Sequence, residues 1–430
     1  MKDFKVGVVG LWHLGCVISA SWSKLGLRVK GFDHNLERLE KLRRGVLPVY
    51  EPGLKEILVD NVQRGRLDFV VDTAGLSDCD FIFLTYDTPV LNDDSSDTTL
   101  LEQSIVELGG IMKDSAVLVV SSQSPVGFCS RMRKNLKEKN PSLDISYSPE
   151  NLRLGEAIEC YLKPDRIILG TNNRETEKRC VELFSMVTTN VIAMSLESAE
   201  MVKHGINSFL ASSIVFANNL ADLCEYSGAN IKDVVKGMKS DPRIGSMAYL
   251  SPGIGFSGGT LGRDLKVLDQ RNSQAGGEAR LFGFIHESNA KRKEVIVSKI
   301  EGILDGLEQK HVGILGLTYK PGTSTLRRSL PLEIAHLLLE KKSVVKVYDP
   351  KADYSEIDGK VKFGIAKDIE EVSARADILV LLTEWEDFLR FDWITVKDRM
   401  NAPNFFDAKN ALSEMEMTQK GFHYYSLGKG

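Results

Sequence analysis

The chain has 430 residues, enough for two to three domains of average size. With 43% hydrophobic and 27% charged residues it has an ordinary globular composition, which excludes a disordered, collagen-like or disulfide-scaffold chain. Lys and Arg total 55 and Asp and Glu total 59, so the formal net charge is −4. This balance provides no global positive field, and we predict neither nucleic acid nor a membrane as partner.

The cysteines and the start of the chain bear on its compartment. The six cysteines lack the close pairs of a zinc site and the spacing of a disulfide framework, so we predict free thiols, no metal and a cytoplasmic location. Val6 to Ile18 is apolar enough to resemble the core of a signal peptide. Asp3, His13 and several glycines break that pattern, and no stretch reaches the 18 apolar residues of a membrane span.

The first 150 residues alternate short apolar runs with amphipathic stretches. Strands are predicted over 5–10, 28–33, 81–85 and 117–121, with a helix over 14–25 between the first two. Strands that alternate with helices indicate βαβ units, hence a parallel sheet covered by helices on both faces.

The pattern changes in the middle of the chain and then returns. Residues 195–227 predict one long helix, a Gly-rich segment covers 251–260, and helical pattern resumes to about 305. From His311 onwards strands are predicted over 312–317, 344–348, 378–382 and 405–407, with a helix over 331–340. We therefore predict an α/β fold with two Rossmann-like, doubly wound parallel-sheet domains, over 1–194 and 306–430, joined by a central helical region over 195–305.

The first strand-to-helix turn carries a dinucleotide-binding pattern. Gly10 and Gly15 hold the first and third glycine positions of that pattern, and Asp33 ends the second strand, where an acid accepts the ribose 2′-hydroxyl of NAD. Trp12 stands where the middle glycine would let the pyrophosphate approach the backbone. We predict NAD as the cofactor, provided that the indole turns away from the phosphate path.

A series of ordered motifs extends this pattern over the whole chain. The motifs are Tyr50-Glu-Pro-Gly-Leu54, Thr88-Pro89, Ser124-Pro-Val-Gly127, Pro149-Glu-Asn-Leu-Arg153 with Gly155, Pro164-Asp-Arg166, Ala199-Glu-Met-Val-Lys203 with Asn207, Asp241-Pro-Arg-Ile-Gly245, Gly255-Phe256 through Arg263-Asp264, Gly316-Leu-Thr-Tyr-Lys-Pro-Gly-Thr323 with Arg327 and Ser329, and Thr383-Glu-Trp385. With these motifs the sequence resembles the UDP-glucose/GDP-mannose dehydrogenase family from Lys5 to about Gly428.

The resemblance implies an activity and a catalytic set. The family oxidises the CH2OH group of a nucleotide sugar to a carboxylate by two hydride transfers to NAD, through a thioester on a cysteine. Lys203 and Asn207 would then stabilise the developing oxyanion, as preorganised donors do, and Glu150 and Asp264 would act as general bases. Lys203 and Asn207 lie four residues apart on a predicted helix and so face the same side. In this family that helix lies at a dimer interface, which implies a homodimer.

The resemblance also implies two binding sets. The residues expected to serve NAD are Gly10, Leu11, Trp12, Gly15, Asp33, Arg38, Thr88, Gln123 and Arg327. The residues expected to bind the nucleotide sugar, with a UDP-hexose as the first choice, are Leu152, Arg243, Tyr249, Gly255, Phe256, Gly258, Lys320 and Lys409. Taken singly, each of the charged residues would pass for an ordinary solvated side chain or a helix cap.

The chain departs from the family at the catalytic nucleophile, because Thr260 stands where the family has cysteine. A threonine hydroxyl is hardly ionised without a dedicated base, whereas a thiol with pKa near about 8.5 is already partly ionised at neutral pH. The thioester route is therefore closed as the family runs it. Neither Cys129 nor Cys224 lies in the Gly-rich loop.

Three functions follow as alternatives. The first is an NAD-dependent nucleotide-sugar dehydrogenase resembling UDP-glucose 6-dehydrogenase with altered chemistry, which ends at the aldehyde or oxidises its hydrate directly. The second is oxidation of another sugar hydroxyl to a ketone, which needs no acyl intermediate. The third is a catalytically inactive nucleotide-sugar-binding homologue, suggested by Trp12 and Thr260 together, since function resides in the site rather than the fold.

Overall fold

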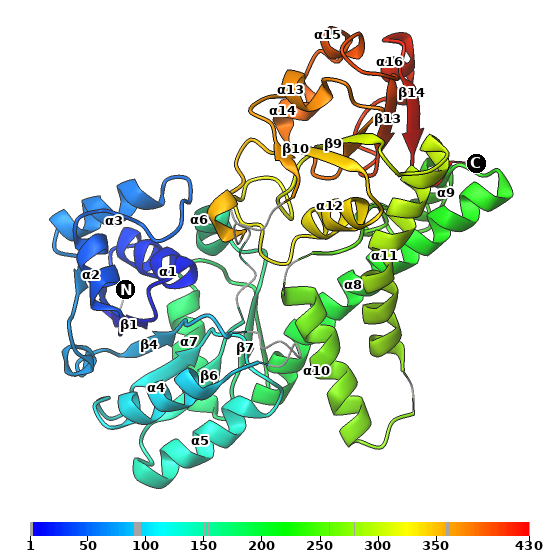
Figure 1. Ribbon diagram of the computed structural model, residues 1–430. Helices are drawn as coiled ribbons and strands as arrows, with labels where there is room; N and C mark the ends of the chain where they lie inside the picture. The colour runs from blue at the N-terminus through cyan, green and yellow to red at the C-terminus, as the bar shows by residue number, and fades with distance from the viewer. Residues whose placement is uncertain are drawn as a thin grey trace. The chain divides into compact units, whose positions relative to one another are not determined.

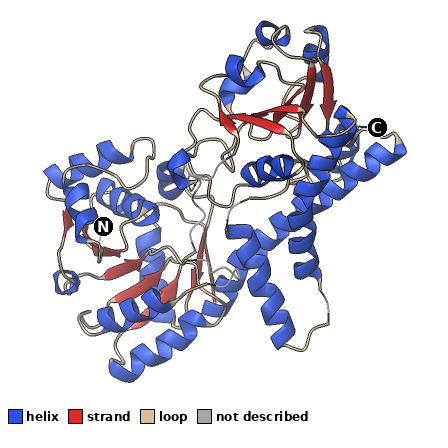
Figure 2. Cartoon of the chain, viewed as in Figure 1, coloured by secondary structure: helices blue, strands red, loops and turns tan. Residues whose placement is uncertain are grey.

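The computed structural model describes residues 3–89, 96–149, 152, 155–257, 259–278, 280–357 and 362–429. The chain divides into two compact units, Met1–Gly205 and Ile206–Gly430. Each unit contains a sheet flanked by helices (Figures 1 and 2). No helix in the described part of the chain has the length and hydropathy needed to cross a membrane.

The first unit is built on an eight-stranded sheet in the order β3-β2-β1-β4-β5-β6-β7-β8. Its strands are β1 (Lys5–Val9), β2 (Arg28–Phe32), β3 (Leu67–Phe69), β4 (Phe81–Leu84), β5 (Val117–Val120), β6 (Asp144–Tyr147), β7 (Ile167–Gly170) and β8 (Val191–Met194). The predicted doubly wound sheet is confirmed, with one correction. Strands β6 and β7 pair antiparallel, through Tyr147 and Gly170, so the sheet is not parallel throughout.

Helices cover both faces of this sheet because the central strands are apolar on both sides. In β4, for example, Phe81 and Phe83 belong to the core on one face, and Ile82 and Leu84 to the core on the other. The first core is completed by α1 (His13–Lys24), α2 (Leu36–Arg43), α3 (Leu54–Gln63), α6 (Ala157–Leu162) and α7 (Arg174–Phe184). The second is completed by α4 (Thr99–Gly109), α5 (Phe128–Lys139) and the start of α8 (Leu196–Ser227).

The long helix predicted over 195–227 is α8, of 32 residues, the green helix of Figure 1. Its first residues, Leu196 and Ala199, pack in the core of the first unit. Its later residues Ala211 and Val215 pack with Leu265 and Ile285 of α10 (Thr260–Gln274) and α11 (Leu281–Leu304). The short helix α9 (Ile231–Lys239) follows α8.

The second unit contains a parallel six-stranded sheet in the order β11-β10-β9-β12-β13-β14. Its strands are β9 (His311–Leu315), β10 (Val344–Tyr348), β11 (Gly364–Ile365), β12 (Ile378–Leu381), β13 (Asn404–Asp407) and β14 (His423–Ser426). One face packs on α11 and α12 (Leu330–Glu340). The other packs on α13 (Ile369–Ser373), α14 (Glu386–Leu389), α15 (Ile394–Lys397) and α16 (Glu414–Gln419). The prediction of a second Rossmann-like domain is confirmed.

Gly15 allows the first helix to lie close to the first strand. A Cβ atom at this position would lie 1.9 Å from the Gly10 carbonyl oxygen and 2.7 Å from Thr85 Oγ1. No rotamer change relieves a clash with backbone, so α1 would have to move.

We expect Gly15→Ala to destabilise the first unit by about 1–3 kcal/mol or more, the cost of overpacking a tight site. Gly205→Ala is the matched control. A Cβ there meets nothing within 4 Å, and alanine in a helix interior is favoured over glycine by up to about 1 kcal/mol. Thermal unfolding of both variants tests this, and an unchanged midpoint for Gly15→Ala would contradict the close approach.

Candidate active site

The turn between β1 and α1 has the backbone form of an anion site. Gly10 has φ 96°, and a Cβ there would lie 2.8 Å from the backbone nitrogen of Tyr86. Helix α1 begins directly after the turn, so its first N–H groups and its dipole face the turn. The capping residue Trp12 makes no side-chain capping bond to these groups. The left-handed Gly10 and the start of α1, which the close approach at Gly15 holds against the first strand, fit a dinucleotide pyrophosphate.

Asp33 ties the end of the second strand to this turn. Its Oδ2 accepts hydrogen bonds from the Leu11 backbone N–H at 2.6 Å and from Arg38 Nη1 at 2.8 Å, and its Oδ1 accepts one from the Asn35 N–H at 2.8 Å. The residue is 2% exposed. A carboxylate has about four lone-pair sites, so three donors leave it capacity for a ribose hydroxyl.

Trp12 turns towards the Asp33 side of the site. The Arg38 guanidinium carbon lies 5.0 Å from the centre of the Trp12 ring, the geometry of a cation–π pair, and Trp12 remains 37% exposed. The sequence left open whether the indole leaves the phosphate path. Its contact with Arg38 puts it beside the carboxylate that would hold the ribose.

The second unit has a similar turn after its first strand, but the aspartate beside it is fully occupied by hydrogen bonds from the protein. Gly316 has φ 88°, and Asp349 ends the second strand of that sheet as Asp33 does in the first. Asp349 accepts six hydrogen bonds from the protein, whose donors are Leu317 N, Thr318 N, Thr318 Oγ1, Trp385 Nε1, Lys351 N and Ala352 N. Its lone pairs are saturated, so of the two acids Asp33 is the one suited to a ribose.

Two other predicted NAD residues meet at the carboxyl edge of the first sheet. The Thr88 hydroxyl donates to the Gln123 carbonyl at 2.6 Å, which joins the segments after β4 and β5.

Leu152 is half-buried and packs on the first core. The predicted site residues Glu150 and Gly258 lie outside the described residues.

Helix α8 carries the predicted oxyanion donors on one buried face. Lys203 is 8% exposed and Asn207 is 7% exposed. The Asn207 side-chain amide donates a hydrogen bond to Asp264, which is fully buried, and Arg263 Nε lies 3.7 Å from Asp264 Oδ1. Asn207 and Asp264, 57 residues apart in sequence, are thus brought together.

Thr260 is the first residue of α10, and its side chain is exposed. Among the residues that the structure describes, its hydroxyl has no hydrogen-bond partner, so no general base contacts it there. A nucleophile at this position would profit from the positive end of the helix dipole.

The Gly-rich segment before Thr260 is held by polar side chains that the sequence analysis missed. Asn289 accepts from the Phe256 N–H at 2.8 Å and donates to the Phe256 carbonyl at 2.9 Å. Arg292 donates to the Gly253 carbonyl at 3.1 Å, and Asn218 accepts from the Gly253 N–H at 2.7 Å. All three lie on α8 or α11, and their only sequence signal is a polar residue on an otherwise apolar helix face.

The predicted basic substrate residues occupy different surroundings in the second unit. Lys320 is half-buried in the loop after β9, and Lys409 follows β13 and pairs with Glu384 at 3.1 Å, so both lie at the carboxyl edge of the second sheet. Arg327, which is predicted to serve NAD and not the substrate, lies in the loop before α12 and is exposed. Arg243 pairs with the neighbouring Asp241 at 2.6 Å on an exposed loop, which holds the pKa of Asp241 below its usual value. Tyr249 is exposed as well.

Glu51 is a second group without an assigned role in the sequence analysis. Its buried carboxylate accepts hydrogen bonds from the Gly155 N–H at 3.0 Å and the Ala157 N–H at 2.9 Å, and it lies 2.8 Å from His13 Nε2. His13 is the first residue of α1, so Glu51 fastens the dinucleotide turn to the start of α6.

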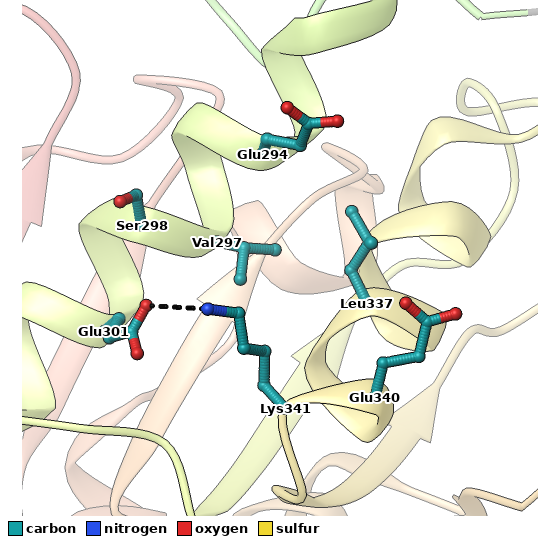
Figure 3. A pocket seen from close by; sticks show the side chains of 7 residues that line it. All are labelled: Glu294, Val297, Ser298, Glu301, Leu337, Glu340 and Lys341. Atoms are coloured by element: carbon teal, nitrogen blue, oxygen red, sulfur yellow. Dashed lines mark hydrogen bonds and ion pairs between the residues drawn. The ribbon is translucent and has the colours of Figure 1, made fainter.

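A cavity of about 400 Å³ lies between α11 and α12 (Figure 3). It contains none of the predicted site residues; the lining residues are Glu294, Val297, Ser298, Glu301, Leu337, Glu340 and Lys341. Three carboxylates against one ammonium make it unsuitable for a phosphate-bearing ligand. This cavity is therefore not the candidate site.

The chain has two Rossmann-like units, and in one of them the aspartate after the second strand, Asp33, can still accept a hydrogen bond from a ribose. These features define a dinucleotide-binding protein. Comparison with known proteins gives the family, and the chain belongs to the UDP-glucose/GDP-mannose dehydrogenase family. Residues 4–188 match the family's NAD binding domain, 197–291 its central domain and 313–414 its UDP binding domain. The family resemblance and NAD as the cofactor are thereby confirmed.

Similar proteins include two bacterial relatives and two solved archaeal structures. A UDP-glucose 6-dehydrogenase of Rickettsia conorii is 33% identical over 98% of both chains. One of Pseudomonas aeruginosa is 30% identical over 98% of this chain and 97% of that protein. A UDP-glucose dehydrogenase structure from Pyrobaculum islandicum covers 100% of this chain and 98% of its own, with TM-score 0.88 and 27% identity. A UDP-D-ManNAc dehydrogenase structure from Pyrococcus horikoshii covers 99% of both chains, with TM-score 0.87 and 23% identity, and so supports the fold alone.

We expect Trp12→Ala to weaken NAD binding by about two- to fivefold, because the exposed cation–π contact that steadies Arg38 is worth roughly 0.5–1 kcal/mol. Trp12→Phe keeps a ring under the guanidinium and should lose less. Isothermal titration with NAD measures both variants. Tighter binding by Trp12→Ala would mean that the indole obstructs the coenzyme.

Proposed function

We propose that the chain oxidises a hydroxyl of a nucleotide sugar with NAD, the C6 alcohol of UDP-glucose being the first choice of substrate. The observation that carries this proposal is the buried hydrogen bond between Asn207 and Asp264. This bond holds the side-chain amide of Asn207 next to the carboxylate of Asp264, and Asn207 lies four residues after Lys203 on α8. An ammonium, an amide and a carboxylate are the groups that removal of a hydride from an alcohol requires.

In this reaction the residues divide the work by charge. Lys203 and Asn207 stabilise negative charge on the reacting oxygen, and Asp264 and Glu150 accept the hydroxyl proton directly or through water. NAD, when bound, supplies the hydride acceptor. Residues Gly10, Leu11, Trp12, Gly15, Asp33, Arg38, Thr88, Gln123 and Arg327 are proposed to bind it.

The nucleotide sugar is proposed to contact both basic and loop residues. Lys320, Lys409 and Arg243 provide positive charge for the diphosphate or hydrogen bonds to the sugar. The other proposed contacts are Leu152, Tyr249, Gly255, Phe256 and Gly258. UDP as the nucleotide is supported by the match of residues 313–414 to the family's UDP binding domain and by the names of the relatives.

Thr260 limits how far the oxidation goes. One hydride transfer turns the alcohol into an aldehyde and releases one proton, and this step needs no nucleophile. The second oxidation in the family uses a thiol. Five of the six cysteines, Cys129 and Cys224 among them, are buried, and burial raises the pKa of Cys129 well above its usual value. The sixth, Cys160, is half-buried in α6 of the first unit. We therefore propose that the reaction stops after one hydride.

We expect the protein to form one NADH per UDP-glucose and to release an aldehyde, as measured by absorbance and mass spectrometry. Thr260→Cys should form two NADH per sugar and a uronate, because a thiol at the start of α10 is activated by the helix dipole. Thr260→Ser, which keeps the hydroxyl, should behave like the parent chain. A uronate from the parent chain would show direct oxidation of the hydrated aldehyde and contradict the proposed stop.

Oxidation of another hydroxyl is the second candidate, since Lys203, Asn207 and Asp264 remain while only the acyl-transfer nucleophile is absent. It also gives one NADH per sugar, so the product must be identified as ketone or aldehyde. A panel of nucleotide sugars that yields no NADH, with binding retained, would instead indicate a nucleotide-sugar-binding homologue.

We further propose a homodimer through α8. Phe209, Phe216 and Leu223 repeat every seven residues, so they share a helix face, and they are 73%, 51% and 62% exposed. Large apolar side chains in such a row usually contact another surface. A second copy of the chain is the proposed partner.

The expected mass in solution is that of a dimer, twice 47.8 kDa. Phe209→Glu with Phe216→Glu should give monomers, because the interface would have to bury two carboxylates from each copy. Leu281→Glu removes an exposed leucine from the start of α11 and is the control that should stay dimeric. Light scattering after size exclusion distinguishes the states, and a monomeric parent chain would refute the proposal.

A further inference from the structure

Two polar side chains on the buried face of α8 have no role in the chemistry proposed above. Glu200 is fully buried and His204 is 2% exposed. They are four residues apart, so they project from the same side of the helix, and Lys203 directly precedes His204. All three belong to the first unit.

Glu200 caps a helix from outside that helix. Its carboxylate accepts hydrogen bonds from the Gly127 N–H at 2.5 Å, the Cys129 N–H at 2.8 Å and the Ser124 hydroxyl at 3.4 Å. Gly127 is the capping residue of α5 and has no side chain that could do this. A glutamate 71 residues further along the chain therefore satisfies donors that the start of α5 would otherwise leave unpaired.

His204 holds the same loop from the next turn of α8. Its Nε2 lies 3.1 Å from the Ser124 carbonyl oxygen. A carbonyl can only accept, so Nε2 carries the proton and donates. The segment from Ser122 to Cys129 is here called the strap loop. It is bound to α8 through the Gly127 and Cys129 N–H groups, which donate to Glu200, and through the Ser124 carbonyl, which accepts from His204.

The strap loop lies at the carboxyl edge of the first sheet, here called the coenzyme edge because the predicted NAD residues Thr88 and Gln123 lie there. It follows β5 at the carboxyl edge of the first sheet, which is where ligands of open α/β sheets bind. There the Gln123 carbonyl accepts from the Thr88 hydroxyl. The loop consequently joins the coenzyme edge to the turns of α8 that surround Lys203.

Burial and hydrogen bonding act in opposite directions on the charge of Glu200. Burial raises the pKa of its carboxyl, and the neighbouring Glu197 carboxylate adds to the rise, while the N–H groups of Cys129 and Gly127 oppose it. A neutral side chain would avoid the cost of burying a charge. The carboxylate is the group that can accept all three donors of the strap loop at once.

We propose that Glu200 and His204 are positioning residues that hold the strap loop in the shape that binds NAD and fix it to the helix that carries Lys203. The part concerning Lys203 rests on the proposed function, and the part concerning NAD does not. Loosening the loop should therefore weaken NAD binding even where no sugar is oxidised.

Glu200→Gln tests this, because it keeps the shape of the side chain and replaces one acceptor oxygen by an NH2 group that faces N–H donors. The Kd for NAD, from isothermal titration, should rise about tenfold, the effect of losing a charge-assisted hydrogen bond. Hydrogen exchange should become faster in the peptide over 122–131. Glu197→Gln is the matched control: Glu197 lies on the same helix but bonds to the Ser130 side chain, so its variant should bind NAD within about twofold of the parent.

A second pair of variants covers the case in which Glu200→Gln does not fold. His204→Phe removes the donor to Ser124 and should weaken NAD binding, and His204→Gln, which retains an N–H donor, should restore most of it. Faster exchange with unchanged NAD affinity, in either series, would reduce these residues to structural ones and overturn the proposal. If the parent chain binds NAD but oxidises no nucleotide sugar, the proposed function fails while this test stands.

Discussion

The hydrogen bond from a turn amide to a buried aspartate is the interaction on which both halves of the molecule depend. Leu11 N–H donates to Asp33 at 2.6 Å, and Leu317 N–H donates to Asp349 at 2.7 Å. Each bond joins the end of the second strand to the turn after the first strand. In the first unit α1 begins directly after that turn. The two acids then differ in what remains of their hydrogen-bonding capacity. Six protein donors saturate Asp349, whereas three leave Asp33 with capacity for a ribose, so of the two acids Asp33 is the one suited to a coenzyme.

Much of this organisation is predictable from the sequence, and the part that is not has a physical cause. Apolar runs of four to six residues followed by amphipathic stretches predict the central strands and α8 to within a residue or two, because burial on one or both faces leaves a periodic signal. The reversal of β7 leaves no such signal, since an antiparallel strand buried on both faces reads like a parallel one. The roles of Glu51, Glu200 and Asn289 could not be predicted from the sequence for another reason. A buried polar residue reads as a surface residue until its partner is known, and these partners lie 33 to 106 residues away.

The proposed catalytic residues show what a family resemblance adds to such reasoning. Spacing alone puts Lys203 and Asn207 on one face of a helix, but only the family motif singles out Asp264, which the structure brings to Asn207. The same region contains the departure at Thr260. In the proposed function, the groups that manage charge during removal of the first hydride are retained and the group that forms the acyl intermediate is replaced. The proposed chemistry thus divides between two steps that rely on different residues.

Buried carboxylates recur at the coenzyme edge of the first unit. They hold the loops there in a fixed shape, although each carboxylate comes from an element distant in sequence from its loop. Glu51 binds the amides at the start of α6 and Glu200 those at the start of α5, each from a distant element. An apolar contact would have filled the same space, but it has no direction and would leave the N–H groups unsatisfied at a considerable desolvation cost. A carboxylate that accepts two or three donors specifies both distance and orientation. The loops that approach a dinucleotide must be specified in that way, since an error of about 1 Å at a binding group is enough to lose much of its effect.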